Sequence, residues 1–151
     1  MKVGFIGLGH MGGPPAKWIL DAGFPLVVHD IRKDAATPLL KSGAIWADTP
    51  GRVAEQCDVV ATCLPGPAEM EDATMGPQGI LGSIQPGAIY IDHTTNSPEL
   101  VRTVGSAIAN RNAKMLDVPL DGGREGALAG DLTLFAGGDK AALDSARPML
   151  E

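Results

Sequence analysis

Three glycines near the amino terminus have the spacing that lets a polypeptide backbone approach a phosphate group. Residues 7–12, with the pattern G-x-G-x-x-G, directly follow the apolar run 3–6 and open a helix-like stretch. In this context Gly7 allows a sharp turn, Gly9 lets the backbone approach a pyrophosphate, and Gly12 lets the helix lie close to the sheet. The sequence therefore predicts a dinucleotide-binding turn.

The start of the following helix would supply the contacts to phosphate. Backbone amides around His10, Met11 and Gly12 would face the phosphates, with the positive end of the helix dipole behind them. Pro14 and Pro15 fall in the first turn, where a missing amide hydrogen costs little. The alternative interpretation is an ordinary glycine-rich turn between a strand and a helix.

An acidic residue ends the second apolar run. Asp30 lies about 20 residues beyond the glycines, where an acid accepts hydrogen bonds from the hydroxyls of the adenosine ribose. A carboxylate there repels a 2′-phosphate, which favours NAD over NADP as the cofactor. Arg32 and Lys33 follow at once and could bind that phosphate in another loop conformation. A loop or helix-capping role for Asp30 is the alternative.

Apolar runs alternate with helix-like stretches along the whole chain. The predicted strands are 3–6, 26–29, 59–63, 88–92, 113–117 and 132–136, with a further short strand near Ile45. The predicted helices are 11–21, 33–42, 49–56, 68–75, 98–110 and 140–150. This alternation is typical of an α/β fold of the Rossmann type, a doubly wound, mainly parallel sheet with helices on both faces. We expect residues 1–151 to form one dinucleotide-binding domain that lacks its last strand.

Segments of unusual composition follow the ends of the predicted strands. The pair Leu64 and Pro65 follows one strand, residues 93–96 follow the next, and residues 119–123 follow the one after. In an open α/β sheet, ligands bind outside the carboxyl ends of the strands. Because these segments and the glycine turn share that edge, we expect one site there.

Composition argues against several classes of function. The formal net charge is −6 with no basic run, which disfavours binding to nucleic acid. No apolar stretch approaches the ~20 residues of a membrane helix, and a predicted strand stands where a signal peptide would begin. We interpret Cys57 and Cys63 as reduced, buried thiols of a cytoplasmic protein, neither a disulfide nor a metal pair.

Taken together, these motifs resemble those of the β-hydroxyacid dehydrogenase family, which includes 3-hydroxyisobutyrate dehydrogenase, tartronate semialdehyde reductase and, more distantly, 6-phosphogluconate dehydrogenase. Residues 7–14 are similar to the family's G-L-G-x-M-G-x-P opening, and residues 92–98 to its D-x-S-T-x-S-P motif. Residues 116–133 resemble its substrate loop, L-D-A-P-V-S-G-G-x-x-G-A-x-x-G-x-L-T. The resemblance covers essentially the whole chain.

The resemblance implies an oxidoreductase, generally a homo-oligomer, that moves a hydride between NAD and a small 3-hydroxy acid. It implies that Leu64 and Pro65 flank the cofactor and that Thr95 hydrogen-bonds near the nicotinamide. It also implies that residues Asp121, Gly122 and Gly123 form the loop that binds the substrate anion. The two glycines suit a carboxylate on physical grounds as well, because successive bare amides form a nest.

Two of these assignments have local alternatives. Thr94 and Thr95 could instead cap the helix that starts near Pro98, and the two glycines of the loop could be a plain turn. Asp121 also stands where the family has serine. A second carboxylate about 4 Å from a substrate carboxylate would cost a few kcal/mol at an effective dielectric of about 20. Three explanations stay open: Asp121 turns away, the substrate is not the usual hydroxy acid, or the loop no longer binds acids.

The family's catalytic lysine is the second departure. In these enzymes it lies in a G-x-x-x-K-x-x-N context well past the substrate loop, so we expect it beyond Glu151, together with an all-helical second domain. The residues present would then supply no catalytic group, and we expect them to bind cofactor weakly and to turn over negligibly. A non-catalytic dinucleotide-binding or interaction module is the alternative, and a relative of the imine reductases is a further one.

Overall fold

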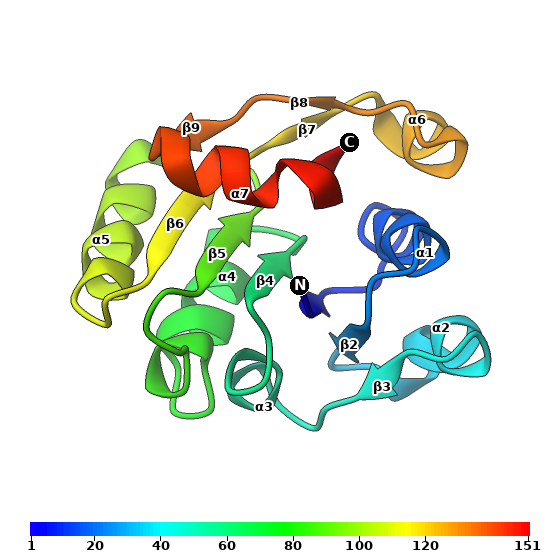
Figure 1. Cartoon of the computed structure of the whole chain (residues 1–151), viewed down its shortest axis with the longest axis horizontal. Coiled ribbons are helices and arrows are strands. Elements are labelled where there is room, and N and C mark those ends of the chain that lie inside the picture. Colours follow the sequence, from blue (N-terminus) through cyan, green and yellow to red (C-terminus); the bar gives the residue numbers. More distant parts are fainter.

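A seven-stranded sheet runs through the molecule, and its six strands β1 to β6 are parallel (Figure 1). The computed structural model describes residues 1–151. The strands of this sheet are β1 (Val3–Ile6), β2 (Leu26–His29), β3 (Ile45–Trp46), β4 (Val59–Thr62), β5 (Ile89–Asp92), β6 (Lys114–Asp117) and β9 (Gly137–Gly138). Their order, β3-β2-β1-β4-β5-β6-β9, contains the strand order of the Rossmann fold. The last strand, β9, pairs with β6 in the antiparallel direction.

Helices cover both faces of this sheet. They are α1 (Gly13–Asp21), α2 (Thr37–Lys41), α3 (Pro50–Ala54), α4 (Pro67–Met75), α5 (Pro98–Ala109), α6 (Gly123–Ala129) and α7 (Lys140–Leu150), with 3₁₀ turns η1 (Lys33–Ala36) and η2 (Ile80–Gly82). On one face, Phe5 shares a buried cluster with Ile19 of α1 and Ala146 of α7. On the other face, Tyr90 shares a cluster with Met70 of α4. The predicted doubly wound α/β class is confirmed, and no helix is long and apolar enough to cross a bilayer.

The central strands agree with the prediction because both of their faces are covered. Every residue of β1, β2, β4 and β5 is buried, which is why each appears in the sequence as a short apolar run. The short strand expected near Ile45 is β3. Residues 33–42 were expected to form one helix, but the structure divides them between η1 and α2. Pro38 stands at the start of α2 and lacks the amide hydrogen that a continuous helix would use there.

The stretch 132–136 is not a strand of the main sheet, contrary to the prediction. Its middle forms β8 (Thr133–Leu134), which pairs antiparallel with β7 (Leu120–Asp121) in a separate two-stranded sheet. Thr133 is exposed and Leu134 is half-buried, so this strand has only one covered face. A run with one covered face suits a two-stranded ribbon, whereas a central parallel strand needs cover on both faces.

Residues 119–136, called the flap from here on, run from the end of β6 to the neighbourhood of α1 (Figure 1). The flap contains β7, α6 and β8. Trp18 of α1 anchors it, because the indole Nε1 donates a hydrogen bond of 3.1 Å to the carbonyl oxygen of Ala127 in α6. Gly130 passes close to the same ring, where an added Cβ would lie 3.2 Å from Cε2 of Trp18. The flap is therefore held to α1 by a side chain and by a close backbone approach.

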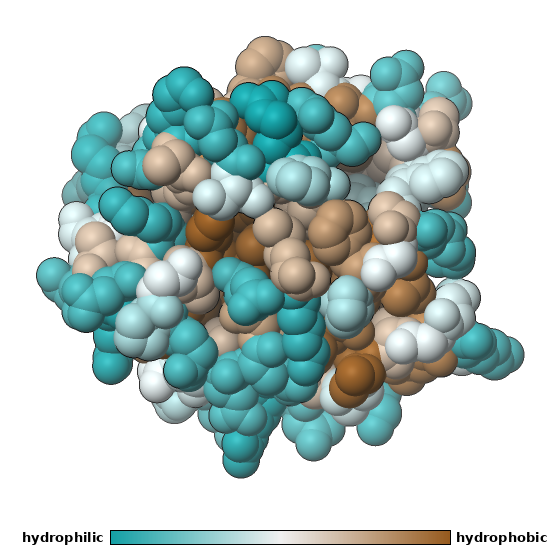
Figure 2. All heavy atoms as spheres, in the orientation of Figure 1, coloured by the Kyte–Doolittle hydropathy of each residue, from teal (hydrophilic) through white to brown (hydrophobic).

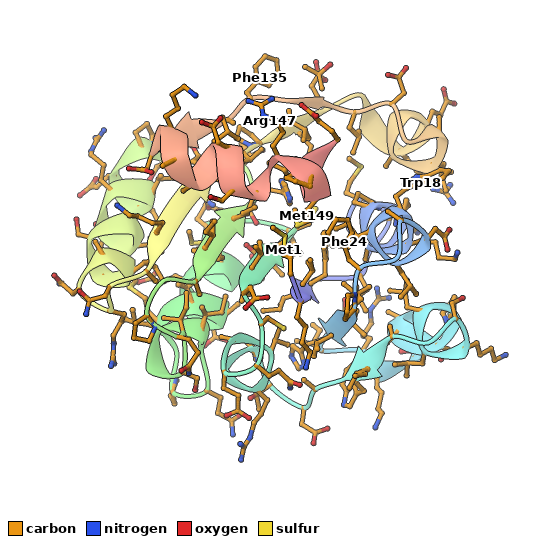
Figure 3. The ribbon with its side chains drawn as sticks, viewed as in Figure 1. Met1, Trp18, Phe24, Phe135, Arg147 and Met149 are labelled. Carbon is orange, nitrogen blue, oxygen red and sulfur yellow. The ribbon has the colours of Figure 1, made fainter.

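An apolar groove of about 480 Å³ lies between α1, α7 and the flap. Figure 2 shows hydrophobic residues gathered in the middle of this face, and Figure 3 places Trp18, Phe24 and Met149 around it. His93, at the end of β5, reaches the floor of the groove beside Phe5. The two rings stack with their centroids 6.2 Å apart.

His93 is a buried histidine whose charge the fold disfavours. Its Nδ1 lies 2.8 Å from the carbonyl oxygen of Val118, which requires the neutral ring to donate from that nitrogen. Burial lowers the pKa of His93 below its ordinary value, and the hydrogen bond to Val118 opposes that effect only in part. The folded protein therefore takes up a proton at this site at a lower pH than the unfolded chain does.

We predict that this difference lowers the stability of the protein in acid. Since the unfolded chain binds the proton below about pH 6.5 and the folded chain does not, the free energy of unfolding falls as the pH drops through that value. The variant His93→Gln keeps a donor for Val118 and removes the proton uptake. Between about pH 7 and about pH 5, the melting temperature of this variant should fall by roughly 3–5 °C less than the melting temperature of the wild type does. His10→Gln, at an exposed histidine, is the matched control, and equal losses in all three proteins would contradict the assignment.

Candidate functional site

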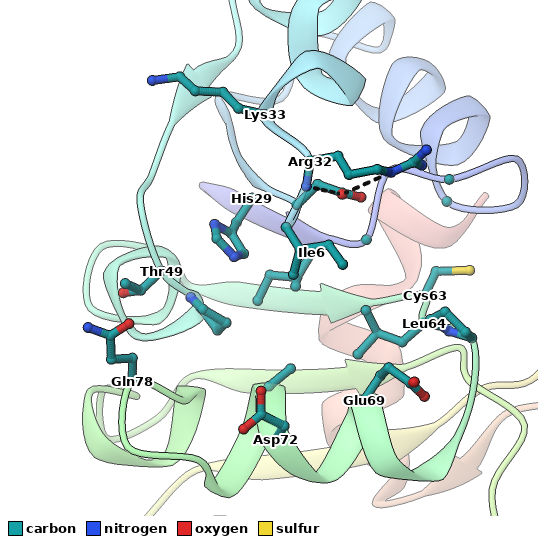
Figure 4. A pocket seen from close by; sticks show the side chains of 18 of the residues that line it. Ile6, His29, Arg32, Lys33, Thr49, Cys63, Leu64, Glu69, Asp72 and Gln78 are labelled. Atoms are coloured by element: carbon teal, nitrogen blue, oxygen red, sulfur yellow. Dashed lines mark hydrogen bonds and ion pairs between the residues drawn. The ribbon is translucent and has the colours of Figure 1, made fainter.

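A cleft of about 1160 Å³ opens at the carboxyl ends of β1 to β4 (Figure 4). The chain runs outward from β1 to β3 on one side and from β4 to β6 on the other, so the cleft lies where the strand order reverses. Its walls are the glycine turn, the ends of β2 and β3, the loop after β4 and one side of α4. The lining residues are Ile6, Gly7, residues 9–12, residues 29–33, Trp46, residues 48–50, residues 63–65, Glu69, Asp72, Ala73, Pro77 and Gln78.

The glycine turn brings backbone segments closer together than side chains allow. Gly7 has φ +90°, and a Cβ on it would lie 2.3 Å from the carbonyl oxygen of Cys63. A Cβ on Gly12 would lie 2.0 Å from the carbonyl oxygen of Gly7. Gly9 has no atom within 4 Å of its Cβ position, and it lines the cleft. The fold itself requires Gly7 and Gly12, whereas Gly9 keeps space open for a ligand.

The start of α1 presents unused hydrogen-bond donors to this cleft. The backbone amides of Gly9, His10, Met11 and Gly12 donate no hydrogen bond within the protein. Prolines occupy the first turn of the helix, and no acidic side chain caps it. Free amides at the positive end of a helix dipole bind an anion such as phosphate. The structure thus brings all four residues together at one turn that lines the cleft.

Asp30 connects this turn to the end of β2. Its Oδ2 accepts a hydrogen bond of 2.7 Å from the amide of Leu8, and its Oδ1 accepts one of 2.8 Å from the amide of Arg32. The side chain is only 8% exposed, and the guanidinium Nε of Arg32 lies 4.0 Å from Oδ1 (Figure 4). A carboxylate has about four acceptor positions, so Asp30 can hold the turn and still accept a bond from a ligand in the cleft.

The cleft beyond Asp30 is flanked by Lys33 and by two side chains that the sequence did not single out, Ile31 and Trp46. Ile31 is 95% exposed although it is apolar, and Trp46 lies at the end of the neighbouring strand β3. The ammonium group of Lys33 lies 5.2 Å from the centroid of the Trp46 ring. An apolar surface with a lysine at its margin suits a flat aromatic base. A short strand was expected near Ile45, and Trp46 ends it.

Across the switch point, Leu64 and Pro65 line the cleft as expected. The amide of Leu64 donates a hydrogen bond of 3.1 Å to Oγ1 of the buried Thr94. Thr95 is exposed and is not part of the cleft lining. Neither threonine caps α5, since Ser97 accepts the bond from the amide of the helix. Thr94, not Thr95, is therefore the hydroxyl that contacts the loop after β4.

A buried hydrogen-bond network holds Thr94 in place. Asp92 accepts bonds of 2.7 Å from Oγ1 of Thr62, 2.6 Å from Nδ2 of Asn96 and 3.1 Å from the amide of Thr94. The hydroxyl of Tyr90 lies 2.9 Å from Thr62 and extends the network. Burial raises the pKa of Asp92, and the three hydrogen bonds oppose that rise. This satisfied carboxylate fixes the loop beside the cleft.

In the flap, Asp121 interacts with the next residue of its own loop. Its Oδ1 accepts a hydrogen bond of 2.8 Å from the amide of Gly122. Gly122 has φ +122° and Gly123 has φ +60°, both in the region that favours glycine. The carboxylate of Asp121 therefore takes one of the amides that the expected nest would offer to a ligand.

The two cysteines lie in different environments. Both are free thiols, and Cys57 is buried as expected. Cys63 is only half-buried and lines the cleft beside Gly12, which corrects the expectation that it is buried. Partial burial raises the pKa of the Cys63 thiol to about 11, so the thiolate is disfavoured at neutral pH.

Known proteins and a protein-family model match this chain along nearly its whole length. The protein-family model described as the NAD binding domain of 6-phosphogluconate dehydrogenase matches residues 2–151. A probable mitochondrial 3-hydroxyisobutyrate dehydrogenase of Dictyostelium discoideum is 39% identical over 149 residues, covering 99% of this chain and 46% of that protein. The NAD-dependent L-serine dehydrogenase of Pseudomonas aeruginosa is 39% identical over 150 residues, covering 99% of this chain and 50% of that protein.

A solved structure agrees with these matches. Psf3 in complex with NADP+ and 2-OPP superimposes with a TM-score of 0.92 at 34% identity, covering 98% of this chain and 52% of that one. The chain thus spans about half the length of the curated relatives it matches.

The contrast between two glycines of the turn gives a test of the site. We predict that Gly12→Ala loses about 3–5 kcal/mol of stability or does not fold, because its Cβ meets backbone. Gly9→Ala should keep its stability within about 0.5 kcal/mol and bind NADH at least about tenfold more weakly. Urea unfolding and calorimetric titration measure the two effects separately. Unchanged NADH binding by Gly9→Ala would show that the pyrophosphate does not pass this residue.

Proposed function

We propose that this chain, which belongs to the family of 6-phosphogluconate dehydrogenase NAD-binding domains, forms the cofactor-binding domain of an NAD-dependent dehydrogenase for a small 3-hydroxy acid. The observation that carries the proposal is the set of free amides at the start of α1, located where the strand order reverses. The names of the relatives support this class of reaction, since they act on 3-hydroxyisobutyrate and L-serine.

The residues around the cleft fit a dinucleotide placed across the switch point. The free amides of residues 9–12 bind the pyrophosphate. Asp30 accepts from the ribose of the adenosine, and Ile31 and Trp46 lie beside the base. Leu64 and Pro65 flank the other half of the cofactor, next to the loop that Thr94 holds. Held there, NAD would supply the hydride acceptor for oxidation of the substrate's carbinol carbon.

The proton of the substrate hydroxyl goes to a group outside residues 1–151 in this proposal. Lys33 is the one lysine that lines the cleft, and it lies over Trp46 on the adenosine side. Lys17, Lys114 and Lys140 pair with carboxylates on the surface. The chain's own contribution is then to bind and orient the cofactor and to present the flap to the substrate.

We predict that residues 1–151 alone do not oxidise 3-hydroxyisobutyrate. With NAD and substrate in excess, the absorbance of NADH should not rise above the rate without protein, since the base of this proposal lies outside residues 1–151. Calorimetry of the same sample should show that NADH binds. Turnover by this chain would contradict the assignment of the base to another segment.

Cofactor choice depends on the residues around Asp30. The buried carboxylate disfavours a 2′-phosphate, although the exposed Arg32 beside it could partly compensate. We predict that NADH binds about tenfold more tightly than NADPH. Arg32→Ala should weaken NADPH binding further while NADH binding stays within about twofold. Lys41→Ala, at a lysine that does not line the cleft, should leave both unchanged. Preferential binding of NADPH would overturn the choice of NAD.

A non-catalytic dinucleotide-binding module is the second candidate function. Asp121 favours it, because a carboxylate occupies part of the loop that would bind a substrate acid. The two candidates separate in a longer protein that contains this chain: an enzyme reduces NAD in the presence of its substrate, and a binding module does not. Assembly as a homo-oligomer, which the resemblance implies, remains a prediction that sedimentation can test.

A further inference from the structure

We propose that His29 makes the cofactor cleft select a purine with an amino group at C6, as in adenine, over one with a carbonyl oxygen there, as in hypoxanthine. This inference rests on the proposed function, which places the base of the dinucleotide beside Ile31 and Trp46. His29 determines which base binds and takes no part in the transfer of the hydride or the proton.

His29 is a buried side chain that reaches the cleft. It ends β2, directly before Asp30, and is only 8% exposed. Figure 4 shows its ring pointing into the cleft, whose opposite wall carries Asp72 of α4. The ring lies beside the indole of Trp46, with the two centroids 5.4 Å apart. His29 therefore stands where the proposed function places the base.

The orientation of the His29 ring is fixed from two sides. Its Nδ1 lies 2.9 Å from the carbonyl oxygen of Ala47, so this nitrogen carries the hydrogen and donates it. The neighbouring indole of Trp46 is held in turn, because its Nε1 donates a hydrogen bond of 2.7 Å to Oδ1 of Asp48. A ring held in this way does not exchange its two nitrogens to suit a different ligand.

The bond to Ala47 determines the character of the other ring nitrogen. In the neutral ring Nε2 has no hydrogen and carries a lone pair, so it can only accept. No group of the protein hydrogen-bonds to it. It is not sealed in the interior either, since Oδ1 of Asn96 is the one buried side-chain polar atom without a partner. Because His29 lines the cleft, Nε2 is an acceptor that a ligand there can reach.

A fixed acceptor distinguishes the two purines by the direction of one hydrogen bond. The amino group is the one donor on the base of an adenine nucleotide, so it is the group that pairs with Nε2. The carbonyl oxygen of hypoxanthine only accepts, so two lone pairs would face each other and both atoms would lose their bonds to water. Hypoxanthine has a donor at N1, but using it would pull the ribose away from Asp30.

Stacking does not separate the two bases. Both are flat purines, and an aromatic surface such as that of Trp46 accepts any base with a π-face. A site that pairs with one polar group rejects an analogue without that group more strongly than an apolar surface does. The discrimination therefore comes from His29.

The test compares NADH with reduced nicotinamide hypoxanthine dinucleotide, which differs from it in the base alone. Calorimetric titration at about pH 8, where an ordinary histidine is neutral, measures both affinities. We expect wild type to bind NADH about tenfold more tightly. His29→Asn keeps an amide that can donate to Ala47 and removes the acceptor, so the two affinities should come within about twofold. His93→Asn, the same change at a buried histidine outside the cleft, should keep the wild-type preference.

A second measurement needs no variant. The ¹⁵N signal of an imidazole nitrogen moves when that nitrogen accepts a hydrogen bond, and the chain has three histidines to assign, His10, His29 and His93. NADH should move the Nε2 signal of His29, and the hypoxanthine dinucleotide should move it much less. The signals of His93 should stay in place with both ligands.

The outcomes separate the role of His29 from the proposed function. Equal affinities of wild type for the two dinucleotides, an undiminished preference in His29→Asn, or an Nε2 signal that NADH does not move would overturn the role of His29 alone. Failure of both dinucleotides to bind would reject the proposed function, and this inference with it.

Discussion

The cofactor cleft depends on one steric constraint, the contact of bare backbone segments between β1, α1 and β4. A Cβ at Gly12 would lie 2.0 Å from the carbonyl oxygen of Gly7, and a Cβ at Gly7 would lie 2.3 Å from that of Cys63. Atoms cannot approach so closely, so any side chain at either position would force α1 away from the sheet. The amides at the start of α1 would then no longer point into the switch point. The chemistry of the site follows from the absence of two side chains.

Hydrogen bonds between neighbouring loops also hold the carboxyl edge of the sheet in place. Asp30 at the end of β2 accepts a hydrogen bond from the amide of Leu8 in the turn after β1. Thr94 after β5 accepts a hydrogen bond from the amide of Leu64 after β4. His93 bonds to the carbonyl oxygen of Val118 after β6. Each strand end is thus tied to an adjacent one, which orders the carboxyl edge before any ligand arrives.

Much of this architecture could be predicted from the sequence, for reasons that are local. The central strands are continuous apolar runs because helices bury both faces, and the glycine pattern marks a turn that only glycine can make. The flap was less accessible. Helix α6 lies between Gly122 and Gly130 and contains Gly126, so its intrinsic helix preference is weak and contact with α1 stabilises it. The bond from Leu64 to the buried Thr94 was also not predicted, because adjacent residue types do not reveal which side of the loop faces inward.

Helix α1 connects the glycine turn to the flap. Its amino end presents the free amides, and Trp18, one turn further along, holds the flap through Ala127. The distance between the glycine turn and the flap is therefore set by one short, packed helix and not by flexible connections. A change at Asp121 can then alter the charge of the flap while the cofactor cleft keeps its geometry. This separation explains how a chain can retain the glycines of the dinucleotide turn and depart from the family pattern at Asp121 in the flap.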